Sequence, residues 1–382
     1  MIDPTVRSQF NYPTDLIYLN TGTLGLCPKS AIDAIKAAID EGEANPGTHL
    51  QHDERWAQVK AQAARVVNAT PGEIAFTRNT TEGANIVCNG LPFSPGDEII
   101  TTNHEHIGNI LPWLARAKRD QLAIKVFDLA PSPEEILARI ANLLTPNTRA
   151  LSIPHVSCAD GRVLPVQAIG AWARERDLWY FVDGAQAPGM IPVDIRAIDC
   201  HAYATSTHKW LLGPKGTGLL YVREDALDLI SPTCVGAFSC ADAVDPRAAN
   251  FAFVPSAQRY EYGTLSGALI AGLGAAFTFL DDIGFDSIHS HDLTLANQFR
   301  DGLQKLDADI LTPRPTHSAI TTFRLPNIPY ADLQSYLMNE HRIRVRGIYE
   351  AGLNAIRISP HLYNTAEEID LTLKAIEAAK KL

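Results

Sequence analysis

A chain of 382 residues is long enough for one large domain with a substantial core and a second, smaller domain. Its formal net charge of −10, without a basic run, argues against nucleic acid or an anionic membrane as a partner. The first residues show no charged-then-apolar leader pattern, no stretch has the length of a membrane span, and the six cysteines form no CxxC pair or metal-ligand spacing. We therefore expect a cytoplasmic protein with free thiols and no metal site.

Short apolar runs alternate with amphipathic stretches between residues 74 and 223. The runs are EIAFT, DEIITT, AIKVFDL, RALSIPHVS, LWYFVDG, HAYATSTH and GLLYVR. Helical patterns such as SPEEILARIANLL and PVQAIGAWARERD lie between several of them. Runs that are apolar on both faces and separated by helices are typical of a mostly parallel sheet covered on both sides. The pattern predicts an α/β domain with about seven strands.

The pattern changes from Ser266 onward. A long apolar segment is followed by helical and strand-like stretches in mixed order, which predicts a smaller α+β domain. We expect a large domain over residues 16–265 and a small domain over 266–382, with residues 1–15 packing nearby. The segment IYLNTGTLGLCP precedes the large domain and is expected to run along the seam between the two.

Polar residues follow the first of these runs, at the edge of the sheet where ligands of α/β proteins bind. After EIAFT comes RNTTEGANIV, in which Thr80 and Thr81 lead into a predicted helix. A helix N-terminus with two hydroxyl groups can bind a phosphate group. The same residues can also form a plain helix cap, with Glu82 in the first turn, and the motif alone favours that interpretation.

Two further runs end in residues that suit a flat ligand. After DEIITT comes NHEHIGN, where His106 could lie on a planar ring or simply make a local hydrogen bond. After LWYFV comes DGAQ, where Asp183 ends a strand of otherwise apolar residues. A buried carboxylate is costly unless it meets a cation or hydrogen-bond donors, although a strand-end aspartate can also cap a turn.

A lysine follows the run HAYAT, in STHKWLLGPKGTG. Burial at a strand end can lower the pKa of Lys209 and make its amine nucleophilic, and Ser206 and His208 flank it as candidate phosphate ligands. A lysine that anchors the loop through an ion pair is the alternative. Together, an anion site, a flat stacking residue, a carboxylate and a lysine suit a phosphorylated cofactor with a cationic ring nitrogen and an aldehyde. That cofactor is pyridoxal phosphate.

These motifs, in this order, resemble the class V aminotransferase-fold enzymes that use pyridoxal 5'-phosphate. That group includes cysteine desulfurases, cystine and cysteine-sulfoxide C–S lyases and isopenicillin N epimerases. The resemblance extends from YLNTGTLG to YNTAEEID, nearly the whole chain. It implies the pyridoxal-phosphate-dependent transferase fold, also described as aspartate aminotransferase-like or fold type I.

The resemblance also implies roles for individual residues. Lys209 would form the Schiff base, Asp183 would pair with the ring nitrogen, and His106 would stack on the ring. Gln186 would bind the phenolic oxygen of the cofactor. The phosphate ligands would be Thr80, Thr81, Ser206 and His208.

Further implied roles concern the substrate and a second chain. Arg357, in AIRISPHLYN, matches the arginine that binds the substrate α-carboxylate through a bidentate pair. Asn20 is a further candidate for substrate binding. Thr264, in YEYGTLSG, matches a threonine that reaches the phosphate of the neighbouring subunit, which implies a homodimer.

Two departures from the family bear on the reaction. Desulfurases carry a nucleophilic cysteine shortly before the carboxylate-binding arginine, whereas this region reads RIRVRGIYEAGLNAIR. Without a thiolate there, we expect no persulfide mechanism. Cys158, in HVSCADG, stands where many relatives carry asparagine. It is either a contact to cofactor or substrate, or a tolerated small replacement.

We therefore expect β-elimination at a carbon–sulfur bond of L-cystine or an S-substituted cysteine, giving pyruvate, ammonia and a sulfur species. Alternatives are an epimerase or aminotransferase on another amino acid, and sulfur transfer like that of the desulfurases. A nicotinamide-dependent dehydrogenase lacks support because no Gly-rich fingerprint follows the first strand. A non-catalytic cofactor-binding sensor would usually lack a catalytic residue or add a DNA-binding segment, and the sequence shows neither.

Overall fold

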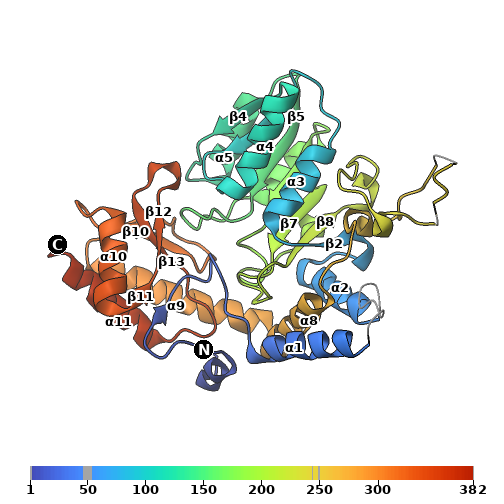
Figure 1. Ribbon diagram of the computed structural model, residues 1–382. Helices are drawn as coiled ribbons and strands as arrows, with labels where there is room; N and C mark the ends of the chain where they lie inside the picture. The colour runs from blue at the N-terminus through green and yellow to red at the C-terminus, as the bar shows by residue number, and fades with distance from the viewer. Residues whose placement is uncertain (1, 46–53, 243, 248–249, 382) are drawn as a thin grey trace.

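A computed structural model describes residues 2–45, 54–242, 244–247 and 250–381 (Figure 1). Its α-helices are α1 (Lys29–Ala44), α2 (Glu54–Val67), α3 (Thr80–Gly90), α4 (Ile107–Asp120), α5 (Pro133–Leu143), α6 (Val166–Arg174), α7 (Ile195–Ile198), α8 (Gly267–Ile283), α9 (Phe285–Lys305), α10 (Tyr330–His341) and α11 (Ala366–Ala379). Its strands are β1 (Ile17–Tyr18), β2 (Ile74–Thr77), β3 (Glu98–Thr102), β4 (Ala123–Phe127), β5 (Thr148–Pro154), β6 (Trp179–Asp183), β7 (Ala202–Ser206), β8 (Gly218–Val222), β9 (Asp309–Ile310), β10 (Thr321–Arg324), β11 (Ile343–Arg344), β12 (Arg346–Ile348) and β13 (Ala355–Ile358). Short 3₁₀ turns include η5 (Ala257–Tyr260) and η6 (Glu350–Gly352).

The seven predicted runs form one seven-stranded sheet in the order β2-β8-β7-β6-β5-β3-β4. Strands β7, β6, β5, β3 and β4 pair in parallel, whereas β8 is antiparallel to both of its neighbours. Strand β2 therefore points in the same direction as β7, and the carboxyl ends of β2, β3, β6 and β7 share one edge. The predicted α/β fold with a mostly parallel sheet is confirmed.

Helices cover both faces of this sheet, as the apolar runs require. Neighbouring residues of a strand alternate between the two faces, so Ile99 joins a core with α3 and α4, and Ile100 joins a core with α2, α5, α6 and α8. In the same way, Phe181 belongs to the core with α3 and α4, and Val182 belongs to the core on the opposite face. Because both faces are buried, the strands contain few polar residues until they reach the sheet edge.

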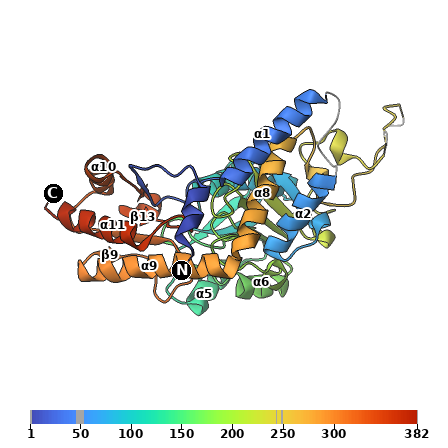
Figure 2. The same ribbon diagram turned by 90° about the horizontal axis from the view of Figure 1, so that it is seen from below.

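The first helix after residue 266 packs on the N-terminal half of the chain. Helix α8 lies against α1 and α2 (Figure 2), and its residues Leu273 and Phe277 belong to the large core. The division of the chain at residue 266 stays a prediction. Among the described residues no single helix is long and apolar enough to cross a membrane, whereas α8 and α9 pass that test only as a pair bent by 78°.

A second, antiparallel sheet has the order β12-β13-β10-β9 and packs against α9, α10 and α11. Strands β10 and β13 lie in the predicted strand-like stretches. Strands β9, β11 and β12 are only two or three residues long, too short for a periodic pattern.

The segment from Ile17 to Gly25 joins the two sheets. Strand β1 pairs in parallel with β11 in a separate two-stranded sheet, and Asn20 forms a bridge to Ser359, the residue that follows β13 of the small sheet. Further along, the N–H of Gly25 donates to the carbonyl of His208 at 2.7 Å. The segment therefore connects the small sheet to the loop that follows β7.

Candidate active site

A cavity of about 330 Å³ opens at the carboxyl edge of the large sheet, facing the small sheet. Nine predicted site residues line it: Thr80, Thr81, His106, Asp183, Gln186, Ser206, His208, Lys209 and Arg357. They come from four strand ends and from β13. The structure thus brings together groups that the sequence separates by as many as 277 residues (357 − 80).

One end of the cavity carries hydroxyl groups at the start of α3. The Oγ atoms of Thr80 and Ser206 lie 2.7 Å apart, and the N–H of Thr80 donates to Ser206 Oγ at 3.0 Å. The helix cap itself is Asn79, whose side chain accepts from the N–H of Glu82. Because capping is done by Asn79, the hydroxyls of Thr80 and Thr81 are not needed for that purpose and line the cavity.

The close approach of β2, β7 and β8 creates this arrangement. Gly218 begins β8, and a Cβ atom there would lie 2.8 Å from Cα of Asn79 and 2.8 Å from the carbonyl oxygen of Thr205. Only glycine fits this position without moving the backbone. The last glycine of GPKGTG therefore lets the two strand ends with Thr80 and Ser206 meet.

His106 lies at the N-cap of α4, with its ring in the cavity wall. Its Nδ1 accepts a hydrogen bond from the N–H of Gly108 at 3.0 Å. Burial, followed by the charge of Lys209, lowers the pKa of His106 to about 4. A neutral ring in this position can stack on a flat ligand.

Asp183 and Lys209 follow neighbouring parallel strands and act on each other electrostatically. Burial lowers the pKa of Lys209 to about 8, and the negative charge of Asp183 partly opposes that effect. Burial raises the pKa of Asp183, while the N–H of Ala185 and the charge of Lys209 lower it. Within the described part of the chain Asp183 has no direct ion pair, and a buried carboxylate in that state suits a cationic ring nitrogen.

Lys209 is fixed by contacts of its own backbone. A Cβ atom on Gly25 would lie 2.0 Å from the carbonyl oxygen of Lys209, so the segment of residues 17–25 can pass this turn only with glycine there. The next residue, Trp210, donates from Nε1 to Oε1 of Gln186 at 2.8 Å, and its carbonyl accepts from Nε2 of His361 at 3.1 Å. The turn that carries Lys209 and Trp210 is therefore fixed by contacts with Gly25, Gln186 and His361.

Gln186 also contacts the backbone of the N-terminal segment. Its Nε2 donates to the carbonyl of Gly22 at 2.8 Å, while its Oε1 accepts from Trp210. The amide has a second N–H for a ligand oxygen in the cavity that it lines. The predicted contact to the cofactor stays a prediction.

Arg357 lies at the opposite end of the cavity and is 1% exposed. Its terminal nitrogens donate to the carbonyl of Cys158 and to Oγ1 of Thr23, each at 2.9 Å. Its Nε is buried without a hydrogen-bond acceptor among the described residues. Burial, followed by the charge of Arg346, lowers the pKa of Arg357 to about 10. A guanidinium without a carboxylate partner is a site for a ligand carboxylate.

Six residues of this wall were not predicted: Gly22, Thr23, Asn79, Gly108, Ala185 and Arg346. Of these, Thr23 bonds to Arg357, and Arg346 is the partner of Arg357 in the neighbouring strand. Arg346 lies directly opposite Arg357 in the pairing of β12 with β13, and its guanidinium pairs with Glu350. The sequence RIRVR contains three arginines at alternating positions, which could have drawn attention to this segment. Strand β12 is too short for its pattern to show which of the three lies opposite β13.

Three predicted residues lie outside the lining. Asn20 accepts through Oδ1 from the hydroxyl of Thr23 at 2.8 Å, so it positions a residue that lines the cavity. Cys158 is buried behind Arg357, and burial raises the pKa of its thiol. Thr264 is exposed and is not part of this wall. Their roles toward ligand or partner stay predictions.

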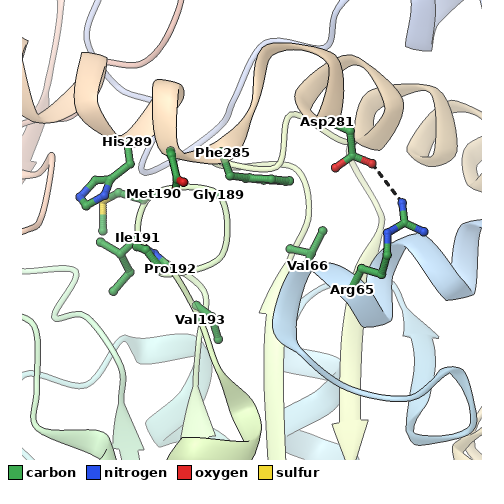
Figure 3. A pocket seen from close by; sticks show the side chains of 11 residues that line it. Arg65, Val66, Gly189, Met190, Ile191, Pro192, Val193, Asp281, Phe285 and His289 are labelled. Carbon is green, nitrogen blue, oxygen red and sulfur yellow. Dashed lines mark hydrogen bonds and ion pairs between the residues drawn. The ribbon is translucent and has the colours of Figure 1, made fainter.

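A second cavity, of about 240 Å³, lies between α2, the loop after β6, the end of α8 and the start of α9 (Figure 3). Its charged residues include Arg65 and Asp281, which pair with each other at 3.1 Å. Apolar groups such as Met190, Ile191 and Phe285 form much of the wall. It lacks a buried nucleophile, so the cavity with Lys209 is the candidate active site.

The residues of the candidate active site fit pyridoxal phosphate. Thr80 and Ser206 offer hydroxyls for the phosphate, and His208 adds a buried Nδ1 that has no partner among the described residues. Asp183 and Lys209 match the ring nitrogen and the aldehyde. A buried Nδ1 without a partner among the described residues is available to a ligand phosphate.

Comparison with known proteins agrees with this chemistry. The family model for class-V aminotransferases matches residues 17–372. A cysteine desulfurase of Klebsiella pneumoniae subsp. pneumoniae is 32% identical over 385 residues, covering 96% of this chain and 94% of that protein.

Two solved structures of the cystine C–S lyase C-DES are also similar. One is a lysine mutant with glycine covalently linked to the pyridoxal-phosphate cofactor, with a TM-score of 0.91, 28% identity and 99% of each chain covered. The other contains the reaction product cysteine persulfide, with a TM-score of 0.88, 29% identity and coverage of 95% of this chain and 98% of that chain.

The family match covers most of the chain and includes every residue that lines the cavity. The fold, the enzyme class and the dependence on pyridoxal phosphate that the sequence predicts are confirmed. The chain belongs to the class V aminotransferase family.

Proposed function

We propose that this protein is a pyridoxal-phosphate-dependent lyase that breaks the Cβ–S bond of L-cystine or of an S-substituted cysteine. The observation that carries the proposal is that one cavity holds both a buried lysine and a buried arginine that has no carboxylate partner among the described residues, without a cysteine on the hairpin beside them. That hairpin, residues 349–354, reads YEAGLN. The similar C-DES structure is described as a cystine C–S lyase, which supports the choice of substrate.

The cavity residues have separate tasks in this reaction. Arg357 binds the α-carboxylate and so orients the substrate. Pyridoxal phosphate, when bound, draws electrons away from Cα of the amino acid. The Lys209 amine removes the Cα proton, and a pKa of about 8 leaves part of it neutral near pH 7. Asp183 stabilises positive charge on the ring nitrogen.

The elimination balances without a redox partner. The Cα proton goes to Lys209, the Cβ–S bond breaks, and its electron pair leaves with sulfur. The unsaturated amino acid then hydrolyses. For L-cystine, one water is consumed and the products are pyruvate, ammonia and thiocysteine.

Sulfur transfer is the second candidate, because several relatives are cysteine desulfurases. It would require a nucleophilic thiolate close to the substrate. Cys158 is the cysteine that acts electrostatically on Lys209, but it is buried and burial raises the pKa of its thiol. A thiol in that state is a poor nucleophile, so the lyase reaction is favoured.

We also propose that the protein is a homodimer in which Thr264 contacts the phosphate site of the neighbouring subunit. Thr264 is exposed and lies outside its own cavity wall. Beside His106, helix α4 exposes Ile107, Leu111 and Leu114 by 50%, 52% and 44%, and their spacing places them on one helix face. An apolar stripe next to the cavity supports a second copy there.

Purified protein incubated with L-cystine is expected to release pyruvate and ammonia in equal amounts, because elimination produces both from one molecule. Pyruvate is measured with lactate dehydrogenase, and L-cysteine is tested in parallel. Alanine from L-cysteine, with sulfur bound to a protein cysteine, would support desulfurase chemistry instead. Exchange at Cα without pyruvate would identify an epimerase, and conversion of the cofactor to its amine form would identify an aminotransferase.

Lys209→Ala is expected to abolish the visible absorbance band of the covalently attached cofactor, because no other amine replaces it at this position. Lys215→Ala is the matched control from the same loop. Lys215 donates to the carbonyl of Gly25 at 2.9 Å and does not line the cavity, so its variant should keep the band. A Lys209→Ala protein that retains the band would show that another residue binds the cofactor.

The rate at which cofactor-free protein binds pyridoxal phosphate covalently is expected to rise with pH, with a midpoint near pH 8, and to level off about one pH unit higher. Only the neutral amine attacks the aldehyde, and the pKa of Lys209 is lowered to about 8. Asp183→Asn should move the midpoint to lower pH, because the charge of Asp183 stabilises the ammonium form. Asp194→Asn, far from the cavity, is the control. A midpoint near pH 10, or one insensitive to Asp183→Asn, contradicts this account.

Sedimentation of the wild-type protein is expected to give the mass of two chains, and Leu111→Glu should shift it toward one chain, since a charge would be buried in the interface. Leu371→Glu changes an exposed leucine on α11 and serves as the control. A wild-type protein that sediments as a single chain at assay concentration would exclude the dimer.

A further inference from the structure

One ion pair at the edge of the cavity, of which only the arginine is part of the lining, has no task in the reaction described above. The guanidinium of Arg346 lines the cavity and pairs with the carboxylate of Glu350. The side chains are 20% and 9% exposed, so both charges are largely removed from water. Largely buried ions are costly to maintain, and a hydrophobic pair of the same size would often be as stable. A role in ligand binding would account for them.

The geometry of the two strands places this pair beside the carboxylate-binding site. Arg346 and Arg357 are direct partners in the antiparallel pairing of β12 with β13, so their side chains emerge on the same face. Two like charges in that position repel each other. Glu350 offsets one of them, and among the described residues Arg357 forms no ion pair. Among the described residues, the cavity wall therefore has one arginine without an ion pair and a second arginine whose charge is offset by Glu350 from just outside the lining.

The position of Glu350 keeps its carboxylate near the cavity. It begins the η6 turn between β12 and β13, and its charge acts on both His106 and Arg357. Its Oε2 also accepts from the N–H of Tyr349 at 3.3 Å. Tyr349 itself is 62% exposed, so the turn lies where the cavity wall reaches the surface. Glu350 and Arg346 are thus placed to contact the end of a substrate that extends from the reacting carbons.

We propose that Arg346 and Glu350 bind the far end of the substrate, and that this end is zwitterionic. A neutral pair of opposite charges complements a group that carries both an ammonium and a carboxylate. The carboxylate would take the place of Glu350 on Arg346, and the ammonium would take the place of Arg346 on Glu350. The preferred substrates are then β-substituted alanines whose sulfur leaving group is itself an amino acid, linked through a disulfide or a thioether.

This inference rests on the proposed lyase function and names the substrate class of the same cavity. A zwitterionic far end of the substrate would also explain why Arg346 and Glu350, rather than uncharged residues, occupy these positions. A substrate with an uncharged far end would leave the Arg346–Glu350 pair intact and gain nothing from it. A substrate with a single charge would engage one residue and leave the other without its partner.

The test uses four thioethers of L-cysteine that differ only at the far end. They are lanthionine, S-(2-aminoethyl)-L-cysteine, S-(2-carboxyethyl)-L-cysteine and S-ethyl-L-cysteine, which end in a zwitterion, a cation, an anion and a neutral group. Pyruvate release gives kcat/KM for each with the holoenzyme. For the wild-type protein we expect lanthionine to exceed the S-ethyl compound by about tenfold or more, in line with charge-assisted hydrogen bonds.

The variants separate the two charges. Glu350→Gln should lower the kcat/KM ratio of the aminoethyl to the carboxyethyl substrate by about tenfold, and Arg346→Gln should raise the same ratio. Exposed matched controls are Glu340→Gln on α10 and Arg344→Gln on β11, which should leave the ratio unchanged. Cofactor content and circular dichroism verify that each variant is folded, and the ratio is independent of the active fraction.

Each outcome bears on a different proposal. Ratios that stay within twofold in both cavity variants, with pyruvate still released, would overturn the zwitterion site and leave the lyase function standing. If no substrate gives pyruvate, the lyase function fails. Binding of the same four compounds, followed through the absorbance of the cofactor, then decides the inference: the order expected above supports it, and equal affinities overturn it.

Discussion

The burial of Lys209 opposite Asp183 is the constraint on which the rest of the site depends. An amine that is removed from water loses part of its affinity for a proton, while a nearby carboxylate restores some of it, and the balance lowers the pKa of Lys209 to about 8. The parallel pairing of β6 with β7 fixes both groups at one sheet edge. A lysine in water would be almost fully protonated at neutral pH, and a lysine paired directly with a carboxylate would be more so. In this site Lys209 is neither exposed to water nor in a direct ion pair among the described residues, so part of it is neutral.

Holding the lysine in that state requires the rest of the chain to close around it. The segment of residues 17–25 crosses the lysine turn at Gly25, where no side chain would fit. On the other side, His361 bonds to the carbonyl of Trp210 through Nε2 and to Asp292 through Nδ1, at 3.1 and 2.6 Å. Both His361 and Asp292 are fully buried. Through this chain of contacts the C-terminal region supports the turn that carries Lys209 and also supplies Arg357. The residues to which the proposed mechanism assigns substrate binding and proton transfer are therefore positioned by the same packing.

The sequence predicted the large sheet well because its strands are buried on both faces, and it located several cavity-lining residues because they follow those strands directly. Thr80, His106, Asp183 and Lys209 could be found in this way, since parallel strands bring their carboxyl ends to one edge. Arg357 and Thr264 came only from the family resemblance. Arg346 was missed because a three-residue strand has no measurable period, and its register with Arg357 depends on a hairpin whose turn includes Ala351 and Asn354 at positive φ. Thr23 contacts Arg357 across 334 residues of chain, and local patterns carry no information about such pairs.

A second buried carboxyl group shows how the ionisation of Asp183 is protected. Glu105 precedes His106, is buried, and accepts from Nδ2 of Asn109 at 2.7 Å, while its other oxygen has no partner among the described residues. Burial, followed by the charge of Asp183, raises the pKa of Glu105 well above its usual range. Two neighbouring carboxyl groups in an apolar setting do not readily ionise together, so one of them holds a proton. Burial raises the pKa of Asp183 too, but the N–H of Ala185 and the charge of Lys209 oppose that rise, which favours the proton on Glu105. The negative charge then lies at the strand end beside the lysine, where a cationic ring nitrogen can use it.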